Sequence, residues 1–303
     1  GENVPERKDI RVSTGNRSYS PAFSYRALSY SGYDRWFFDP DAPARQHRNY
    51  DLWEMRNRLQ FGHAIHRTSD AHGFDFNWRD SYGGHNVARA ALRGTSLKDM
   101  PDRYPLVEQN GEKKRIEKGQ ICFTHPANVR GAIETAASYL KEHPRVTTYS
   151  MSLQDRGGFC VCDRCVEANG GVLPSKRPDR VVWKFMNKVA RGLRKKVPDG
   201  RIYFLATYGH MTRPPEGVKA ADGIVAVTAH VRNNSKNITN PDCPYNRVYY
   251  DNIKAVQSTG ALLRSYDYIM FGGTPQPLTI LDAIRTYNDL DYMGDQAERM
   301  GRD

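Results

Sequence analysis

Apolar residues recur at helical spacing in several long stretches of the chain. Residues 123–144 and 177–197 each carry an apolar residue at every third or fourth position, which predicts two amphipathic helices. Pro126 stands where a first helical turn accepts proline. The predicted buried stripes consist of Val129, Ile133, Ala137 and Leu140 in the first helix, and of Val182, Phe185, Val189 and Leu193 in the second. Residues 245–260 and 277–290 predict two further helices.

Short runs of nearly continuous apolar residues lie between these helices and are typical of strands that are buried on both faces. The clearest runs occupy residues 22–30, 146–153, 201–208, 223–231 and 261–271. Residues 60–65 predict one further strand. Residues 72–92 are rich in glycine and histidine and read mostly as a loop around a short third strand. A poor last strand is expected near Tyr292.

Strands that alternate with helices predict a parallel sheet covered by helices. Six clear strands and two weak ones approach the count of a TIM-type (β/α)₈ barrel, at close to its usual size. We therefore expect an α/β fold in which residues 1–21 form an N-terminal extension and residues 22–303 form one barrel, with irregular second and third units and a weak eighth strand. A doubly wound open sheet is the alternative, and the lack of a glycine-rich phosphate loop after the first strand disfavours it.

Composition supports a globular chain without a membrane span. A hydrophobic content of 39%, with four Trp, eighteen Tyr and eleven Phe, supplies a substantial core. The longest uncharged apolar run is far shorter than the ~20 residues that cross a bilayer. The chain begins without a start Met or a leader-like apolar segment, so we expect a mature or excised fragment of a larger protein.

The net charge of +11 raises the question of a polyanionic partner. Ten Lys and Arg residues against two Asp residues between Lys176 and Arg201 supply +8 of that charge. Helical spacing places several of them on one face, which predicts a solvated outer surface of the second helix rather than a nucleic-acid site. The residues on this face are Lys184, Lys188, Arg191 and Lys195. No nucleic-acid-reading motif accompanies them.

In a parallel barrel, catalytic and binding residues lie at the carboxyl ends of the strands. Asp155 follows the fourth predicted strand and Asp267 ends the seventh. The other polar and aromatic residues at these ends suit a saccharide, because flat rings pack on sugar C–H faces while polar groups bond the hydroxyls. The expected substrate-binding residues are Arg26, His85, Tyr208, His230, Arg232, Tyr266 and Tyr268.

Two carboxylates on non-adjacent strands are what glycoside hydrolysis requires. One protonates the leaving oxygen and the other acts as nucleophile or base. We expect Asp155 to be the general acid/base and Asp267 its partner. The alternative for each is a structural role, because an Asp after a strand often caps a helix or pairs with a nearby Arg.

Three cysteines, Cys160, Cys162 and Cys165, form a C-x-C-x-x-C cluster directly after Asp155. A closed tetrahedral zinc site needs a fourth ligand. Cys243 follows the sixth predicted strand and should reach the same face of the barrel, so we expect a structural Cys₄ zinc site. The alternative is one disulfide, Cys165–Cys243 or Cys160–Cys243, with the remaining thiols free. Cys122 is expected to be a buried apolar residue.

The order of these features resembles one family. Residues 119–140, 149–165, 177–208, 241–253 and 262–272 are similar to a bacterial family of large, mostly secreted proteins known as domain of unknown function 4838, which is grouped with TIM-barrel glycoside hydrolases. The residues that match its pattern are Asp155, Cys160, Cys162, Cys165, Cys243, Asn246, Tyr266, Asp267 and Tyr268. Gln154 stands where that pattern has Asn. The resemblance implies polysaccharide utilisation and a secreted or periplasmic location.

Two functions from different classes follow from these residues. The first is a glycoside hydrolase that acts on a complex glycan, with an acidic glycan as one option, through Asp155 and Asp267. The second is a non-catalytic carbohydrate-binding barrel with the same polar and aromatic lining, held by a metal or a disulfide. Both predict a carbohydrate partner and no organic cofactor, and the family resemblance implies additional domains in the same polypeptide. The distance between the two carboxylates distinguishes them.

Overall fold

The computed structural model describes residues 81–82, 84–144, 146–208, 211, 213–230 and 244–267, all within one compact unit, Asp75–Thr274. Five strands of this unit form a parallel sheet: β1 (Ser81–Tyr82), β4 (Thr148–Ser150), β5 (Arg201–Thr207), β6 (Ile224–His230) and β7 (Leu262–Asp267). The strands expected at residues 22–30, at residues 60–65 and near Tyr292, and the helix expected at 277–290, lie outside the described residues.

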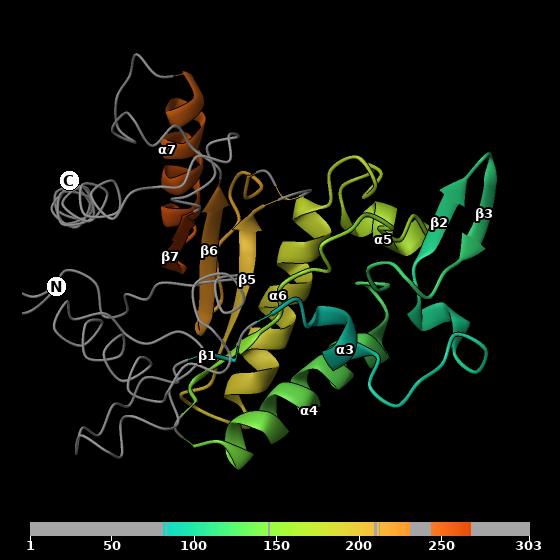
Figure 1. Cartoon of the computed structure of the whole chain (residues 1–303), viewed down its shortest axis with the longest axis horizontal. Helices are drawn as coiled ribbons and strands as arrows, with labels where there is room; N and C mark the ends of the chain where they lie inside the picture. Colours follow the sequence, from blue (N-terminus) through green and yellow to red (C-terminus); the bar gives the residue numbers. More distant parts are fainter. Residues whose placement is uncertain are drawn as a thin grey trace, which may run out of the picture. The chain divides into compact units, whose positions relative to one another are not determined.

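The order of strands in the sheet is β1-β4-β5-β6-β7, and every neighbouring pair is parallel (Figure 1). The prediction of parallel strands that alternate with helices is therefore confirmed for this part of the chain. Among the described strands, the order in the sheet follows the order in the sequence throughout. In a doubly wound sheet, the strand order reverses at the switch point. This order agrees with a singly wound arrangement, and closure into a barrel stays a prediction.

Three of the crossover helices match the sequence-based expectations. They are α4 (Pro126–Glu142), α6 (Asp179–Arg194) and α7 (Pro244–Gln257). All four residues of the apolar stripe expected in α6 are buried, and Trp183 packs edge-on against Phe204 of β5 with ring centroids 5.0 Å apart. In α4, Ala137 and Leu140 are buried, while Val129 and Ile133 are half-buried at the edge of the same core.

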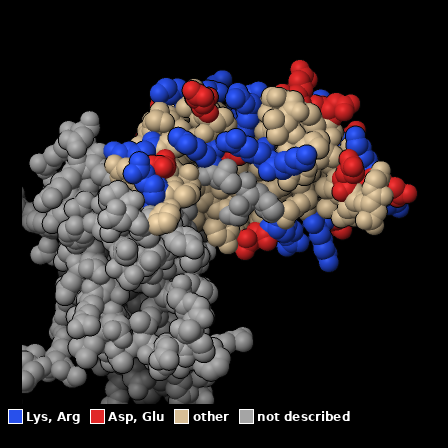
Figure 2. All heavy atoms as spheres, turned by 90° about the horizontal axis from the view of Figure 1, so that it is seen from above, with Lys and Arg blue, Asp and Glu red and all other residues tan. Residues whose placement is uncertain are grey.

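The basic residues of α6 lie on its outer face, as expected. Lys184, Lys188, Arg191 and Lys195 are all exposed. Figure 2 shows basic side chains spread over one face of the described residues, with acidic side chains interspersed. Among the described residues, no helix combines the length and apolar character that crossing a bilayer demands.

Several short elements were not expected from the sequence. Residues 72–92, read mostly as a loop, contain helix α3 (Val87–Ala91) in addition to β1. Strands β2 (Leu106–Gln109) and β3 (Glu112–Arg115) form an antiparallel hairpin that projects away from the main sheet (Figure 1). Its turn consists of Asn110 at φ 53° and Gly111 at φ 80°, the left-handed pair that a two-residue hairpin turn requires. A 3₁₀ turn, η3 (Pro101–Arg103), and helix α5 (Asp163–Ala168) complete the set.

Candidate functional site

The connection that follows β1 and the segment that follows β4 lie side by side at the carboxyl edge of the sheet. The imidazole of His85 forms a hydrogen bond through Nδ1 with the carbonyl of Leu153, and the side-chain amide of Gln154 donates to the His85 carbonyl over 2.7 Å. The ring of Tyr208, directly after β5, lies 6.5 Å from the His85 ring, centroid to centroid. The structure therefore brings together His85 and Tyr208, two of the expected substrate-binding residues.

Asp155 lies in the segment after β4, and it is exposed. Among the described residues its carboxylate has no ion-pair partner within 4.0 Å. It does not cap α5, which begins at Asp163. The structural roles considered for Asp155, helix capping and pairing with an Arg, are therefore not seen in the described part of the chain.

The carboxyl ends of β6 and β7 complete the described part of this edge. The register pairs His230 of β6 with Asp267 of β7, and Ala229 with Tyr266. His230, Tyr266 and Asp267 are thus at the strand ends where the sequence placed them. In the sheet, β4 and β7 are separated by β5 and β6, which corresponds to about 14 Å between their axes at the usual strand spacing. Arg26, Arg232 and Tyr268 lie outside the described residues.

A buried glutamine holds the segment that carries Asp155. Gln120 is fully buried, and its amide nitrogen donates to the carbonyls of Gln154 at 2.8 Å and Arg156 at 2.5 Å. Its amide oxygen accepts from the Gln154 backbone N–H at 3.1 Å. The Gln120 N–H donates to the carbonyl of Gly158 at 3.1 Å. Sequence reasoning missed Gln120, because nothing in its local pattern marks it.

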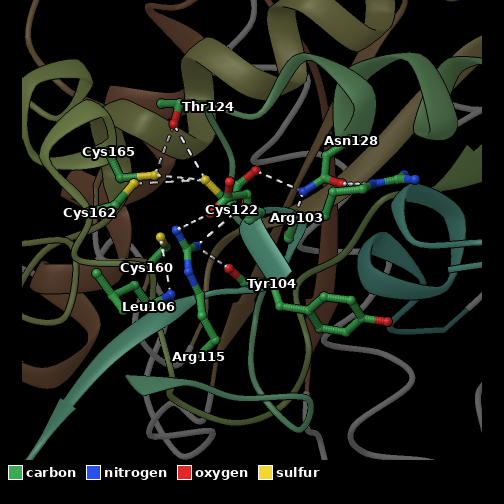
Figure 3. A network of polar contacts seen from close by, with 11 residues as sticks. Arg103, Tyr104, Leu106, Arg115, Cys122, Thr124, Asn128, Cys160, Cys162 and Cys165 are labelled. Atoms are coloured by element: carbon green, nitrogen blue, oxygen red, sulfur yellow. Dashed lines mark hydrogen bonds and ion pairs between the residues drawn. The ribbon is translucent and has the colours of Figure 1, made fainter. Parts of the chain in front are cut away.

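Four cysteines from two separate connections meet beside this segment (Figure 3). Cys122, Cys160, Cys162 and Cys165 place all their sulfurs within 4.8 Å of one another. The Sγ of Cys122 lies 3.8 Å from that of Cys162 and 3.7 Å from that of Cys165. Three of the four cysteines are buried, Cys162 is half-buried, and all four are free thiols. We call this group the sulfur cluster.

The sulfur cluster corrects the expectation for Cys122. That residue is buried, as expected, but it supplies the fourth sulfur of the cluster rather than acting only as an apolar core residue. The sequence analysis assigned the fourth position to Cys243, which lies outside the described residues. Cys122 reaches the other three sulfurs because the connection that carries it runs between β1 and β4, which are neighbours in the sheet.

Cys122 is held in place by a network of buried polar groups (Figure 3). Its backbone N–H donates to the Arg103 carbonyl at 3.1 Å, and its own carbonyl accepts from the Asn128 side chain at 2.9 Å. The same Asn128 amide also donates to the Arg103 carbonyl at 2.7 Å, and the Arg103 guanidinium returns a hydrogen bond to Asn128 Oδ1 at 2.9 Å. These contacts fix the backbone of Cys122 beside the first turn of α4.

Hydrogen bonds around the sulfurs favour thiolates at some of these positions. A hydrogen bond from Cys160 is the main cause that lowers the pKa of Cys122 to about 6. Hydrogen bonds, first from Cys122, also lower the pKa of Cys162, and the thiols that act as donors, Cys160 and Cys165, have raised pKa values. The hydroxyl of Thr124 lies 3.2 Å from the Cys165 sulfur, and the Leu106 N–H donates to the Cys160 sulfur at 3.4 Å.

Four sulfurs in this arrangement could hold a metal ion. Soft thiolate ligands arranged tetrahedrally suit zinc or iron, and four protein ligands leave no open position for substrate. A metal bound by all four sulfurs would therefore have a structural rather than a catalytic role. The disulfides considered from the sequence both involve Cys243 and stay untested.

None of the candidate catalytic or substrate-binding residues lines the cavity of about 350 Å³ that the described residues form. The β2–β3 turn lines one side of it, and Phe159, Val161 and Leu173 line the other. Both polar and apolar residues line this cavity, and among the described residues no pair of carboxylates faces across it. We therefore do not connect it with the carboxylate chemistry expected from the sequence.

Comparison with known proteins identifies one family. A family model described as a domain of unknown function (DUF4838) matches residues 1–300, nearly the whole chain. Neither the curated proteins nor the solved structures contain a match.

Proposed function

We propose that this chain, which belongs to the DUF4838 family, is a glycoside hydrolase domain. One observation carries the proposal. Residues that suit saccharide binding and hydrolysis lie at one edge of a parallel sheet whose strands follow the order of the sequence. His85, Asp155 and Tyr208 follow β1, β4 and β5, and His230 and Asp267 end β6 and β7. The carboxyl edge is where parallel α/β enzymes build their active sites.

In this proposal Asp155 is the general acid/base and Asp267 the second carboxylate. Glycosidases separate their two carboxyl groups by about 5 to 9.5 Å. A flat sheet would leave the ends of β4 and β7 about 14 Å apart, which is too far for two short side chains unless both point toward each other. Closure of the strands into a barrel turns their carboxyl ends toward one axis and shortens that separation, so the proposed mechanism includes the (β/α)₈ barrel.

The saccharide would lie against the remaining residues of this edge. The rings of His85 and Tyr208 are tilted by 39° to each other, with their centroids 6.5 Å apart. One sugar ring could contact one of them with its edge and the other with its face. The side chains proposed to bond hydroxyls or a substrate carboxylate are Arg26, His230, Arg232, Tyr266 and Tyr268. The arginines favour a glycan that carries acidic groups.

We also propose that the sulfur cluster binds zinc. A tetrahedron with zinc–sulfur bonds of about 2.3 Å has edges of about 3.8 Å, and the two sulfur pairs of Cys122 are 3.7 and 3.8 Å apart. Elemental analysis of the purified protein should find one zinc per chain. Iron in its place, or a metal-free protein with a mapped disulfide at these positions, would contradict the assignment.

The decisive experiment compares three aspartate variants on aryl glycosides and polysaccharides. We expect Asp155→Asn and Asp267→Asn each to lower kcat/KM by about 10²–10⁴-fold, the usual contribution of general acid–base catalysis. Asp251→Asn is the matched control, because Asp251 is a partly exposed residue of α7 that pairs with Arg247 at 3.3 Å, away from the strand ends. Its activity should equal that of the wild type.

A leaving-group series sharpens the assignment of Asp155. An aryl glycoside with an acidic phenol departs with little protonation, so Asp155→Asn should lose much less activity on such substrates than on polysaccharide. Asp267→Asn should lose activity on both kinds of substrate. Undiminished turnover of polysaccharide by Asp155→Asn would remove Asp155 from the mechanism.

One observation favours a non-catalytic carbohydrate-binding domain as the second candidate. Asp155 is exposed, whereas the general acids of glycosidases are commonly set in partly apolar surroundings. A binding domain would retain polysaccharides in affinity electrophoresis and lose that binding in His85→Ala or Tyr208→Ala, with no turnover by the wild type. Hydrolysis by the wild type that depends on Asp155 would exclude this candidate.

A further inference from the structure

We propose that Gln120 is a positioning residue for the candidate catalytic segment, and that it links this segment to the sulfur cluster. The inference rests on the proposed function only for its effect on catalysis. The link itself is a structural claim that can be tested without a substrate.

The first argument is the way Gln120 brackets Asp155. Its side-chain amide bonds the backbone of Gln154 in both directions and the carbonyl of Arg156, so the residues on either side of Asp155 are held by one buried group. A fourth hydrogen bond, from the Gln120 N–H to Gly158, extends the contact along the segment. No side chain other than a primary amide of this length supplies two donors and one acceptor in this geometry.

The second argument is the close approach of the two backbones. Gly158 has φ of +79°, and a Cβ on it would lie 3.0 Å from the Cα of Gly119. A Cβ on Gly119 would lie 2.9 Å from the carbonyl oxygen of Gly158. Two glycines therefore permit residues 119–120 and 154–158 to run side by side, and a side chain at either position would push the segments apart.

The third argument is that the sulfur cluster anchors both of these segments. Cys122 follows Gln120 by two residues, and Cys160 follows Gly158 by two. The sulfurs of these two cysteines belong to one cluster with all ligand atoms within 4.8 Å. A metal held there would fix the ends of the two segments, and Gln120 would carry that constraint to Asp155.

The same network reaches a second strand end. Gln154, held by Gln120, donates its side-chain amide to the carbonyl of His85 at 2.7 Å. His85 in turn bonds Leu153, the residue before Gln154. Gln120 thus supports both the candidate acid and a candidate substrate contact, although it touches neither side chain.

The experiment replaces Gln120 with methionine, which keeps the length and volume of the side chain but removes its hydrogen bonds. Gln109→Met, at the exposed end of strand β2, is the matched control. The readouts are hydrogen exchange of the amides of residues 154–158, metal stoichiometry, the visible spectrum of the cobalt-substituted cluster, and kcat and KM on the best glycoside substrate.

In Gln120→Met we expect exchange at residues 154–158 to quicken at least tenfold, with one metal per chain and an unchanged cobalt spectrum. The loss of activity should fall on kcat, by about 10–100-fold, because small misplacements of a catalytic group have effects of this size. Gln109→Met should match the wild type in every readout. Unchanged exchange at these amides in Gln120→Met would overturn the proposal.

Two further outcomes separate this inference from the proposed function. If the wild type turns over no glycoside, the hydrolase proposal fails, while the exchange measurement still decides the role of Gln120. If Gln120→Met does not fold, Gly158→Ala tests the same contact, because its Cβ separates the two backbones without removing a buried polar group. Gly158→Ala should then show the same faster exchange with metal retained, and protection equal to that of the wild type would count against the proposal.

Discussion

Cys122 connects two parts of the chain that are otherwise far apart in sequence. Cys160, Cys162 and Cys165 come from one segment, and Cys122 precedes Cys165 by 43 residues. Its carbonyl and N–H are fixed by Asn128 and Arg103, so its sulfur is presented to the cluster from a rigid backbone. At the scale of single residues, Cys122 therefore supplies the sulfur that joins the local C-x-C-x-x-C motif to a segment distant in sequence.

We expect Cys122→Ser to lose metal binding and Cys243→Ser to keep it. Loss of an outer-shell partner weakens metal binding by about 10–100-fold, and loss of a ligand should exceed that. The measurement is metal content after dialysis against a weak chelator, together with the affinity from competition with a chromogenic chelator. Retention of one metal per chain by Cys122→Ser, with loss in Cys243→Ser, would restore the ligand set expected from the sequence.

Three of the four cluster cysteines could be predicted from the sequence, because their C-x-C-x-x-C spacing is itself a signal. Cys122 has no such spacing, but a topological rule could have found it. Connections that follow neighbouring parallel strands lie at the same edge of the sheet, and Cys122 lies in the connection between β1 and α4, next to the connection that follows β4. The sequence analysis applied that rule to Cys243 and not to Cys122. For Gln120 no rule existed, because its partners are backbone groups.

Helix α4 begins at a residue whose capping ability depends on pH. His125 is its N-cap, and Nδ1 of the imidazole accepts from the Ala127 N–H at 3.2 Å. Burial is the first cause that lowers the pKa of His125, followed by the positive charges of Arg164, Arg103 and Arg130, while Asp102 opposes the shift. The folded state therefore favours the neutral ring, which is the form that can accept this hydrogen bond.

This cap should make the chain less stable in mild acid. Because the folded-state pKa lies below the ordinary value of 6.5, the stabilisation is fully present above about pH 6.5 and is lost as the pH falls through the folded pKa. Protonation also places a positive charge at a helix N-terminus. His125→Asn keeps an acceptor at every pH, so its free energy of unfolding should fall less steeply between about pH 7 and 5, by a difference of about 1 kcal/mol.

Thermal denaturation of the metal-loaded wild type and variant across this pH range checks the cap. Acid also weakens metal–thiolate binding in both proteins, so the difference between the two slopes isolates His125. Parallel slopes would show that the cap contributes nothing to the pH dependence.

At the scale of elements, length decided what could be predicted. Helices α4 and α6 are long enough for the apolar period to be unambiguous, and both are confirmed. Helix α3 has five residues and α5 has six, too few to establish a period. The β2–β3 hairpin is different, because Asn110-Gly111 is a strong turn signal that the sequence analysis did not use.

The described unit contains two separate clusters of buried residues. The main core is formed by α4, α6 and strands β4 to β6, where residues such as Trp183, Phe185 and Phe204 are buried. The sulfur cluster forms a separate small group with Leu106 at its edge. A metal bound there would join Cys122 to Cys165 and close a loop whose restriction in the unfolded state is worth about 4 kcal/mol, by analogy with a disulfide.

Metal removal should therefore weaken this protein without unfolding it. In a zinc finger the metal supplies nearly all the folding free energy, so chelation unfolds the chain. Here the core of α4, α6 and the sheet is an apolar cluster separate from the sulfur cluster. We expect a strong chelator to lower the thermal midpoint by roughly 10 °C, since about 1 kcal/mol corresponds to 2–4 °C in a domain of this size.

Far-ultraviolet circular dichroism at 25 °C should stay close to that of the loaded protein, and added zinc should restore the original midpoint. Proteolysis should become faster at residues 154–160, because that segment is the one that the cluster and Gln120 hold. Cys122→Ser is the internal control, since chelation should leave its already lowered midpoint unchanged. Complete loss of the dichroism signal on chelation would mean that the sulfur cluster, rather than the helix–sheet core, determines whether this chain folds.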